Sequence, residues 1–309
     1  MSGVLVIDKP KGWTSHDVVA RIRKVLKIKK AGHGGTLDPL ATGVLPVYLE
    51  EGTKLVSFNL EGTKEYRATM KLGQETDTLD SDGKITVEKE GFCCTPEMIE
   101  ETLARFRGPI RQFPPLYSAI KYRGLPLYKW VRAGERPTVA EREVMVHALS
   151  LKEFSSPLVT LEVSCGRGTY IRSLCADIGR MLGCGGHLVE LRRLRCGKFA
   201  LDQAISLEKL PWWLEQGRIE EKIISLKDSV DLSGEIQLEE KAATKVRQGQ
   251  PLHLMDLPGG EREKLGKGRR MGLFQEPELL LAIAESRVDG GPWLSGNPQV
   301  LQILRVFRG

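Results

Sequence analysis

The run GHGGTLDPLATGVLPV at residues 32–47 contains two side chains that could do chemistry, His33 and Asp38. Its glycines relax the backbone while Pro39 and Pro46 stiffen it, which predicts a shaped loop. Flanking leucines place the Asp38 carboxylate at the rim of an apolar wall, and a buried strand should follow directly. A carboxylate held on such a loop can act as a nucleophile or a base. An aspartate before proline is also a common turn residue, so this run alone leaves both interpretations open.

The segment CGRGTYIR at residues 165–172 contains a second candidate side chain, Arg172. It predicts a glycine-containing turn and, with Thr169 as its cap, a helix that runs to about Leu182. Arg172 then lies in the first turn, where a cation is unfavourable for the helix dipole, so we expect an anionic group to hold it there. Tyr170 beside it, and Tyr66 on an alternating strand pattern, are further candidates because of their amphipathic rings.

The basic residues of this chain are clustered, although the formal net charge of its 309 residues is only +6. Three separated basic groups lie at residues 27–30, 192–198 and 262–270. In a near-neutral chain this clustering favours a polyanionic partner such as nucleic acid. Residues 107–123 add basic and aromatic side chains around two consecutive prolines. That mixture could hold nucleic acid by phosphate contact and stacking, or it could be a proline-stiffened packing loop.

The sequence offers little support for a metal, nucleotide or membrane site. Its six cysteines form no C-x-x-C pair, and Cys184-x-x-His187 lacks a second ligand pair, which argues against zinc. The acidic run ETDTLDSDG at residues 75–83 fails the EF-hand spacing and is expected to be a solvated loop. P-loop, dinucleotide and Ser-His-Asp patterns are missing, and a glycosidase would need a second carboxylate. Because the sequence shows no signal peptide and no apolar run of membrane length, the cytoplasm is the expected location.

Strand and helix patterns surround these candidates and must position them. A strand at residues 3–7 leads into a helix capped by Thr14 or Ser15, which delivers the chain to the 32–47 loop. Alternation predicts a strand at 65–73, in which Tyr66 shares one face with apolar residues, and a pair of strands at 144–154 and 158–164. From about residue 233 the composition changes to a β-rich module of about 75 residues, within the lower part of the domain size range.

Four ordered motifs between residues 4 and 195 carry a family resemblance. GHGGTLDPLATGVLPV resembles the signature loop of the bacterial TruB family of tRNA pseudouridine synthases, and LVIDKPKGWTSHDVV resembles the opening motif of that family. PPLYSAIKYRGLPLYKWVRAG is similar to its central motif, and GRGTYIRSLCADIG with GGHLVELRRL to its later pair. Dyskerin, the eukaryotic and archaeal relative that works in a guide-RNA particle, shares part of the pattern. The run LATGVLPVYLEEGTKL and the chain length look more like the stand-alone bacterial type.

The resemblance implies an α+β pseudouridine synthase fold, with a mixed, largely antiparallel central sheet flanked by helices. It implies a catalytic domain at residues 1–230 and a small β-rich PUA-like RNA-binding domain at 231–309. The implied reaction is isomerisation of the T-loop uridine at position 55 of tRNA, with base flipping and without metal or organic cofactor. The expected partner is tRNA; no membrane and no protein partner are expected, and the chain should be a monomer.

The same resemblance assigns roles to individual residues of this chain. Asp38 would be the nucleophile, and Arg172 would pair with it and favour its charged form. Tyr66 would stack on the flipped base, with Tyr170 and Leu191 lining the pocket. His33 would contact RNA beside the flipped nucleotide or else pack in the loop, while Lys9 and Pro10 would support that loop. The atom that Asp38 attacks stays open, and so does a competing class, a non-catalytic RNA-binding or RNA-chaperone protein of the same fold.

Overall fold

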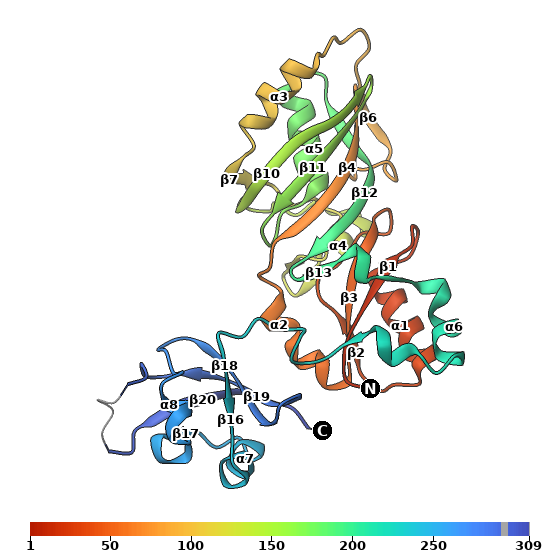
Figure 1. Cartoon of the computed structure of the whole chain (residues 1–309). Coiled ribbons are helices and arrows are strands. Elements are labelled where there is room, and N and C mark those ends of the chain that lie inside the picture. The colour runs from red at the N-terminus through yellow and green to blue at the C-terminus, as the bar shows by residue number, and fades with distance from the viewer. Residues whose placement is uncertain (292–295, 309) are drawn as a thin grey trace.

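A computed structural model describes residues 1–291 and 296–308, and a large mixed sheet forms its centre (Figure 1). Neighbouring strands of this sheet follow the order β14 (Ile205–Ser206), β1 (Gly3–Lys9), β3 (Thr42–Leu49), β12 (Gly186–Cys196), β4 (Lys64–Leu72), β11 (Leu158–Cys165), β10 (Arg142–Ser155) and β7 (Gly108–Gln112). Short strands β2 (Ala31–His33), β13 (Phe199–Ala200) and β15 (Ile223–Ile224) pair beside this path. Only the β1–β14 and β3–β12 pairs among the described strands of this sheet are parallel, which confirms the predicted mixed, largely antiparallel arrangement.

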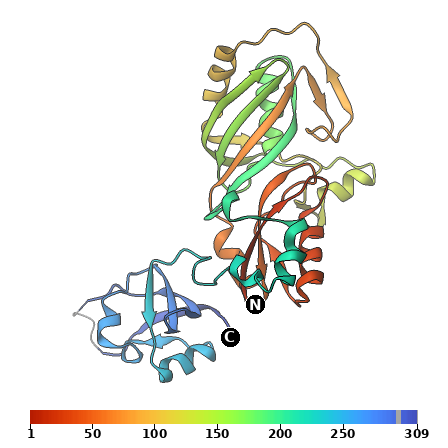
Figure 2. The ribbon, with the colours of Figure 1, turned by 45° about the vertical axis from the view of Figure 1, so that its right-hand side comes forward.

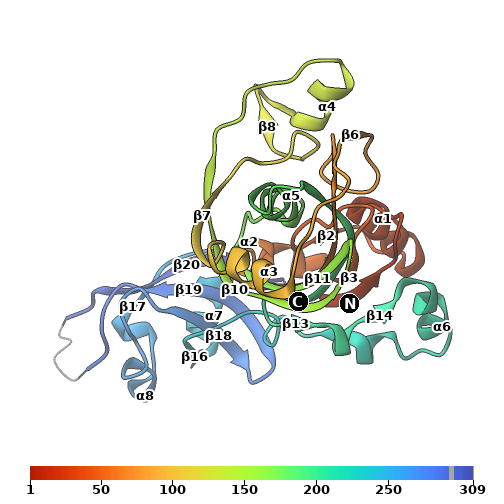
Figure 3. The ribbon, with the colours of Figure 1, turned by 90° about the horizontal axis from the view of Figure 1, so that it is seen from above.

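Helices and small hairpins flank the central sheet. The helices of this part are α1 (Ser15–Leu26), α2 (Val56–Asn59), α3 (Pro96–Ala104), α4 (Leu127–Arg132), α5 (Ile171–Met181) and α6 (Leu210–Glu215). The hairpins are β5 (Gln74–Thr76) with β6 (Ile85–Glu88), and β8 (Lys121–Tyr122) with β9 (Leu125–Pro126). Viewed from above, α5 lies against the sheet, whereas the excursion that carries β8 and α4 extends outward (Figure 3).

A second, smaller sheet closes the chain, and we call residues 231–309 the C-terminal module (Figure 2). Its strands follow the order β16 (Gly234–Gln237), β18 (Arg270–Glu276), β19 (Leu279–Ser286), β20 (Gln299–Val306) and β17 (Leu252–His253), with helices α7 (Glu240–Arg247) and α8 (Gly259–Arg262). This confirms the expected small C-terminal β-rich unit. Within the described residues, no helix is long and apolar enough to cross a membrane.

Alternation along β4 explains how one strand serves both the core and a cavity. Its even-numbered side chains point to one face, where Ala68, Met70 and Leu72 are buried in the main apolar core. Lys64 and Tyr66 continue the same face toward the start of the strand, beyond the apolar core residues. A single alternating pattern therefore anchors the strand at one end and presents functional side chains at the other.

The start of α1 is capped as predicted, whereas the start of α5 is not. Thr14 caps α1 with a capping box, in which its side chain accepts from the backbone of Asp17 and the Asp17 carboxylate accepts from the backbone of Thr14. The prediction that Thr169 caps α5 is wrong. The N-cap residue is Tyr170, without a side-chain cap, and the Thr169 hydroxyl donates to the carbonyl of Gly166 instead. Thr169 therefore closes the preceding turn instead of capping the helix.

Candidate active site

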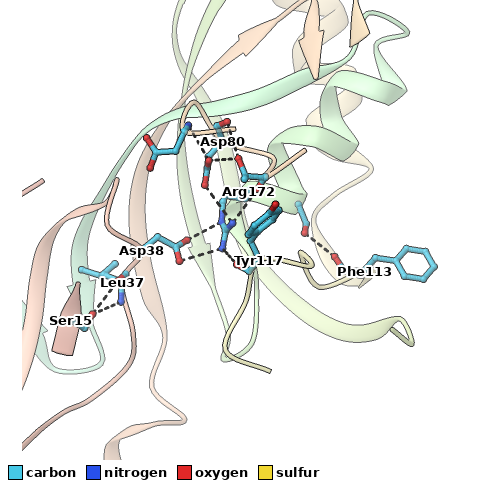
Figure 4. A network of polar contacts seen from close by, with 10 residues as sticks. Ser15, Leu37, Asp38, Asp80, Phe113, Tyr117 and Arg172 are labelled. Carbon is cyan, nitrogen blue, oxygen red and sulfur yellow. Dashed lines mark hydrogen bonds and ion pairs between the residues drawn. The ribbon is translucent and has the colours of Figure 1, made fainter. Parts of the chain in front are cut away.

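The loop between β2 and β3 carries Asp38, and residues of the first segment of the chain hold it in place. Lys9, fully buried, donates from Nζ to the carbonyls of Trp13 (2.6 Å), Pro10 (3.0 Å) and Pro39 (3.3 Å). The Ser15 hydroxyl and the Leu37 backbone bond to each other in both directions, as Figure 4 shows. The predicted support of the loop is thus confirmed for Lys9, whereas the Pro10 carbonyl contacts Lys9 and its own support of the loop stays a prediction.

Arg172 at the start of α5 faces the Asp38 carboxylate; its first-turn position predicted an anionic partner, and the resemblance implied that this is Asp38. Its Nε lies 2.9 Å from Asp38 Oδ2, and its Nη2 lies 3.3 Å from Oδ1. The arginine side chain is only 5% exposed while that of Asp38 is 36% exposed. The carboxylate can therefore meet a ligand from solvent while its partner stays fixed in the protein (Figure 4).

A second carboxylate, that of Asp80, holds the far side of the Arg172 guanidinium. Asp80 Oδ2 lies 3.4 Å from Arg172 Nη1, and the carbonyls of Thr78 and Tyr117 accept from the same guanidinium at 3.1 and 3.0 Å. The prediction that residues 75–83 form a solvated loop is wrong at Asp80, which is 5% exposed. Burial raises the pKa of this carboxyl, although the Thr78 hydroxyl and Arg172 oppose the rise. Composition made the segment look solvated, and only the fold shows that one of its aspartates faces inward.

A cavity of about 430 Å³ brings most of the predicted site residues together. Its lining includes Asp38, Arg172, Tyr66, Tyr170 and Leu191. Burial raises the pKa of Tyr66 to about 12 and also raises that of Tyr170, so both rings are neutral phenols near neutral pH. A carboxylate at one side and two neutral aromatic rings with an aliphatic wall suit a flat, polar-edged ring as ligand.

His33 is the predicted site residue that this lining does not include. It ends β2, pairs in register with Val47, and has a buried Nδ1 without a hydrogen-bond partner among the described residues. Burial, with Arg193 and His16 nearby, lowers its pKa, which favours the neutral ring. His33 therefore lies on the loop that carries Asp38 but outside the cavity, which leaves its proposed RNA contact a prediction.

Two cations that line the cavity were not identified as site residues from the sequence, Lys64 and Arg193. The sequence placed Arg193 in a basic group suited to a polyanion, but the structure buries it, at 1% exposure. Its neighbours in that group are also engaged, because Arg192 pairs with Asp8 and Arg195 with Glu65. The 192–198 group is therefore divided, with Arg193 buried at the cavity and Arg192 and Arg195 in ion pairs at the surface. The alternating pattern of β4 could have pointed to Lys64, since it lies two residues before Tyr66.

Residues 107–123 pack partly against the site, and their nucleic-acid contact stays a prediction. The Tyr117 carbonyl accepts from Arg172, and Gln112 bonds to the backbone of Tyr170 in both directions, so part of the segment packs against the site. Phe113 is nevertheless 59% exposed, and the following excursion extends away from the sheet (Figure 3). A second cavity of about 700 Å³ on this side shares Asp38 and Arg172 and is bounded by Tyr128 and Arg132 of the excursion.

A resident metal site is not evident in the described residues, since no group of three or more His, Cys, Asp or Glu side chains is placed to hold one. Cys184 is buried, with its Sγ 3.4 Å from the Gly185 carbonyl. His187 Nδ1 lies 2.9 Å from the carbonyl of Gln74. Each side chain of the Cys184-x-x-His187 pair is thus engaged by backbone.

Solved structures of similar fold include Cbf5 in a Cbf5–Nop10–Gar1 complex, at 29% identity and a TM-score of 0.72 over 99% of this chain and 85% of that one. Another is a chain of an H/ACA RNP bound to a substrate RNA containing 2′-deoxyuridine, at 28% identity and a TM-score of 0.73, with the same coverage. Curated relatives named tRNA pseudouridine synthase B include proteins of Geobacter sulfurreducens, 44% identical over 99% of this chain and 100% of the relative, and of Syntrophus aciditrophicus, 43% identical over 99% of each.

Family models match consecutive parts of the chain. The N-terminal domain of TruB family pseudouridylate synthases matches residues 23–171, and the C-terminal domain of tRNA pseudouridylate synthase B matches residues 172–231. The chain therefore belongs to the TruB family of pseudouridylate synthases and is an isomerase, which confirms the predicted family and the predicted pseudouridine synthase fold.

Proposed function

We propose that this protein isomerises the T-loop uridine at position 55 of tRNA to pseudouridine, with Asp38 as the nucleophile. The observation that carries the proposal is the 2.9 Å contact of Asp38 with a buried Arg172 at the wall of a cavity large enough to admit a base. The tRNA substrate is supported by the names of relatives that align over almost the whole chain. Such a substrate also implies that the protein works in the cytoplasm.

The chemistry requires a charged Asp38 and a pocket that keeps the base captive. Arg172 favours the carboxylate form by its charge and fixes its direction, because Asp80 and the Thr78 carbonyl hold Nη1 while the Tyr117 carbonyl also holds Nη2. Tyr66 supplies a stacking face for the flipped uracil, and Tyr170 and Leu191 bound it. After the N-glycosidic bond breaks, this enclosure allows the ring to turn and rejoin through C5 without escaping.

We also propose that residues 1–230 form the catalytic domain and residues 231–309 a PUA-like RNA-binding domain. The separate sheet of the C-terminal module and its own apolar core support this division. The expected role of the module is to grip the acceptor side of the tRNA, which would extend the contact beyond the T-arm. No protein partner is needed for the reaction as proposed, and a monomer would suffice.

A tritium-release assay on unmodified tRNA carrying 5-tritiated uridine tests the proposal directly. Only isomerisation releases tritium from C5, so a non-catalytic RNA-binding or chaperone protein of this fold would give none. Asp38→Asn keeps the shape of the side chain and removes its charge, and we expect it to abolish release while RNA binding remains. Near-wild-type turnover of Asp38→Asn would show that Asp38 is not the nucleophile.

A further inference from the structure

Lys64 and Arg193 are buried cations at the cavity for which the described part of the chain supplies no ion-pair partner. Lys64 is 8% exposed and Arg193 is 1% exposed, and both line the cavity that contains Asp38. Other cations nearby are balanced: Arg172 by Asp38 and Asp80, and Arg167 by Glu61. The cavity wall therefore carries an excess of positive charge.

Backbone carbonyls hold these two cations without neutralising them. Lys64 donates from Nζ to the Leu60 carbonyl at 2.6 Å, and Arg193 donates to the carbonyls of Val44 (2.7 Å) and Gly35 (3.1 Å). Such bonds satisfy hydrogen-bond donors, but a buried charge without a counter-charge still costs free energy. Burial and the neighbouring Arg193 indeed lower the pKa of Lys64. An anion that enters the cavity would relieve this cost.

Strand register places both cations on the same side as the Tyr66 ring. Arg193 of β12 pairs directly with Tyr66 of β4, and Lys64 lies two residues earlier on the same strand. Cross-strand partners and residues two apart share one face of a sheet. Leu191, paired with Ala68, continues that face as an apolar wall. A ring stacked on Tyr66 would thus have two positive side chains along its edge.

We propose that Lys64 and Arg193 are further catalytic residues, which stabilise the negative charge on the uracil ring while it is detached from the ribose. This inference rests on the proposed function. If Asp38 attacks C1′, an O–C1′ bond forms and the C1′–N1 bond breaks, with its electron pair left on N1 and spread over O2 and O4. When C5 then bonds to C1′, Asp38 leaves as a carboxylate, the C5 proton passes to solvent and N1 takes up a proton. Attack on the ring at C6 would place negative charge on O4, one of the same carbonyl oxygens, so the role is similar on either route.

Lys64 and Arg193 would bind a delocalised oxyanion. The uracil anion is one source of this group, and an RNA phosphodiester is another. The depth of Lys64 and Arg193 in the cavity favours uracil, because both lie beside the Tyr66 ring. The Arg167 side chain, by contrast, is 59% exposed at the edge of the cavity. Phosphates of a flipped nucleotide remain nearer to solvent than its base. The two sources predict different responses to chemical changes in the RNA.

Lys64→Met keeps most of the side-chain volume and removes the charge, and Lys64→Arg restores a charge. We expect Lys64→Met to lower the single-turnover rate on T-arm RNA on the order of 10- to 100-fold, with RNA affinity within about threefold of wild type and partial rescue by Lys64→Arg. With 5-fluorouridine at the target, the deficit in glycosidic cleavage should shrink, because fluorine itself stabilises the uracil anion. Arg67→Met is the matched control: Arg67 lies on the opposite face of β4, paired with Glu162, and its loss should leave the rate unchanged.

Three results would overturn the inference. These are a wild-type rate for folded Lys64→Met, an equal deficit on uridine and 5-fluorouridine, or a deficit that lies wholly in RNA affinity. A methylphosphonate at the target nucleotide tests the phosphate source: if it weakens wild-type binding but not binding by Lys64→Met, the cation grips phosphate instead. Thermal unfolding of each variant confirms folding. An inactive wild type would refute the proposed function. An active wild type whose rate does not change when Lys64 is replaced would refute only this inference.

Discussion

Arg172 is a buried guanidinium between two carboxylates, one facing solvent and one facing the protein. Asp80 pairs with the guanidinium on the side of the protein interior, and Asp38 pairs with it on the solvent side. This division explains why the sequence could identify Arg172 and Asp38 but not Asp80. Helix-dipole reasoning indicated that Arg172 needs an anion, and the family resemblance implied that this anion is Asp38. Nothing local marks Asp80 as buried among the other carboxylates of residues 75–83, because its burial depends on contact with a helix about 90 residues later in the chain.

Replacement of Arg172 by lysine should separate positioning from charge. Lysine keeps the charge but cannot contact Asp38, Asp80 and two carbonyls with one planar fork. We expect Arg172→Lys to lower the single-turnover rate by roughly 100-fold or more, with RNA affinity mostly retained. Arg180→Lys, a surface change on the same helix, serves as the control and should be nearly silent. Equal losses of binding and rate in Arg172→Lys would show instead that Arg172 clamps a phosphate.

Lys9 predicts a pH dependence of stability. Burial lowers its pKa from 10.5 to about 8, although Asp38 opposes the shift. Between these values the unfolded chain binds a proton at Lys9 that the folded chain does not, so stability from this group rises as pH increases from about 8 to 10.5. Compared with Lys9→Met, the wild type should gain on the order of 2–3 kcal/mol across this window. Urea unfolding of both proteins at several pH values measures the difference, and a difference that does not change with pH would contradict the shift.

At the scale of elements, patterns in the sequence located most strands and helices but not how distant strands pair. The apolar run at 44–49 predicted β3, and alternation predicted β4, β10 and β11, because these signals are local. The parallel contact of β3 with β12 joins Thr42 and Gly43 to Arg192 and Arg193. No local pattern encodes a pairing across about 150 residues, so the burial of Arg193 could not be foreseen. Once that pairing forms, the loop that carries Asp38 is fixed to the strand that carries Leu191.

Substitution of Gly43 tests the contact between β3 and β12. Its φ is +99°, and a Cβ built there would lie 2.2 Å from the Arg193 carbonyl oxygen, so a side chain is excluded by both conformation and space. Gly43→Ala should destabilise the protein by at least about 2 kcal/mol and lower activity, because the Asp38 loop would shift. Gly32→Ala, in the same segment with no atom within 4 Å of its Cβ, should change stability by less than about 0.5 kcal/mol. Equal stability of the two variants in urea unfolding would show that β3 and β12 can move apart at Gly43 without cost.

At the scale of the whole molecule, the C-terminal module shares an apolar layer with the catalytic sheet. Val4, Val44, Tyr48 and Phe199 pack in one cluster with residues of the module, namely Phe274, Leu280, Ile283 and Phe307. Polar contacts border this layer, since Lys54 Nζ donates to the Val306 carbonyl at 2.8 Å and the Arg308 amide to Glu51 at 2.6 Å. Composition indicated a separate module but gave no sign of this interface. Truncation after Val230 would expose the layer, so a loss of RNA affinity in a truncated chain would mix lost contacts with lost stability.

Phe307→Ala in the full-length protein tests the interface without removing the module. Phe307 is 3% exposed near the end of the chain, and its truncation to alanine should cost about 3–4 kcal/mol. The wild type should unfold in urea as one cooperative unit, with tryptophan fluorescence and far-ultraviolet circular dichroism giving coincident transitions. In Phe307→Ala the two transitions should separate, because the module then unfolds before the central sheet. Met255→Ala, at a position 69% exposed on the same module, is the control and should leave both transitions in place. Coincident, unshifted transitions in Phe307→Ala would mean that the shared layer does not couple the module to the sheet, and RNA affinity could then be assigned to the module by truncation alone.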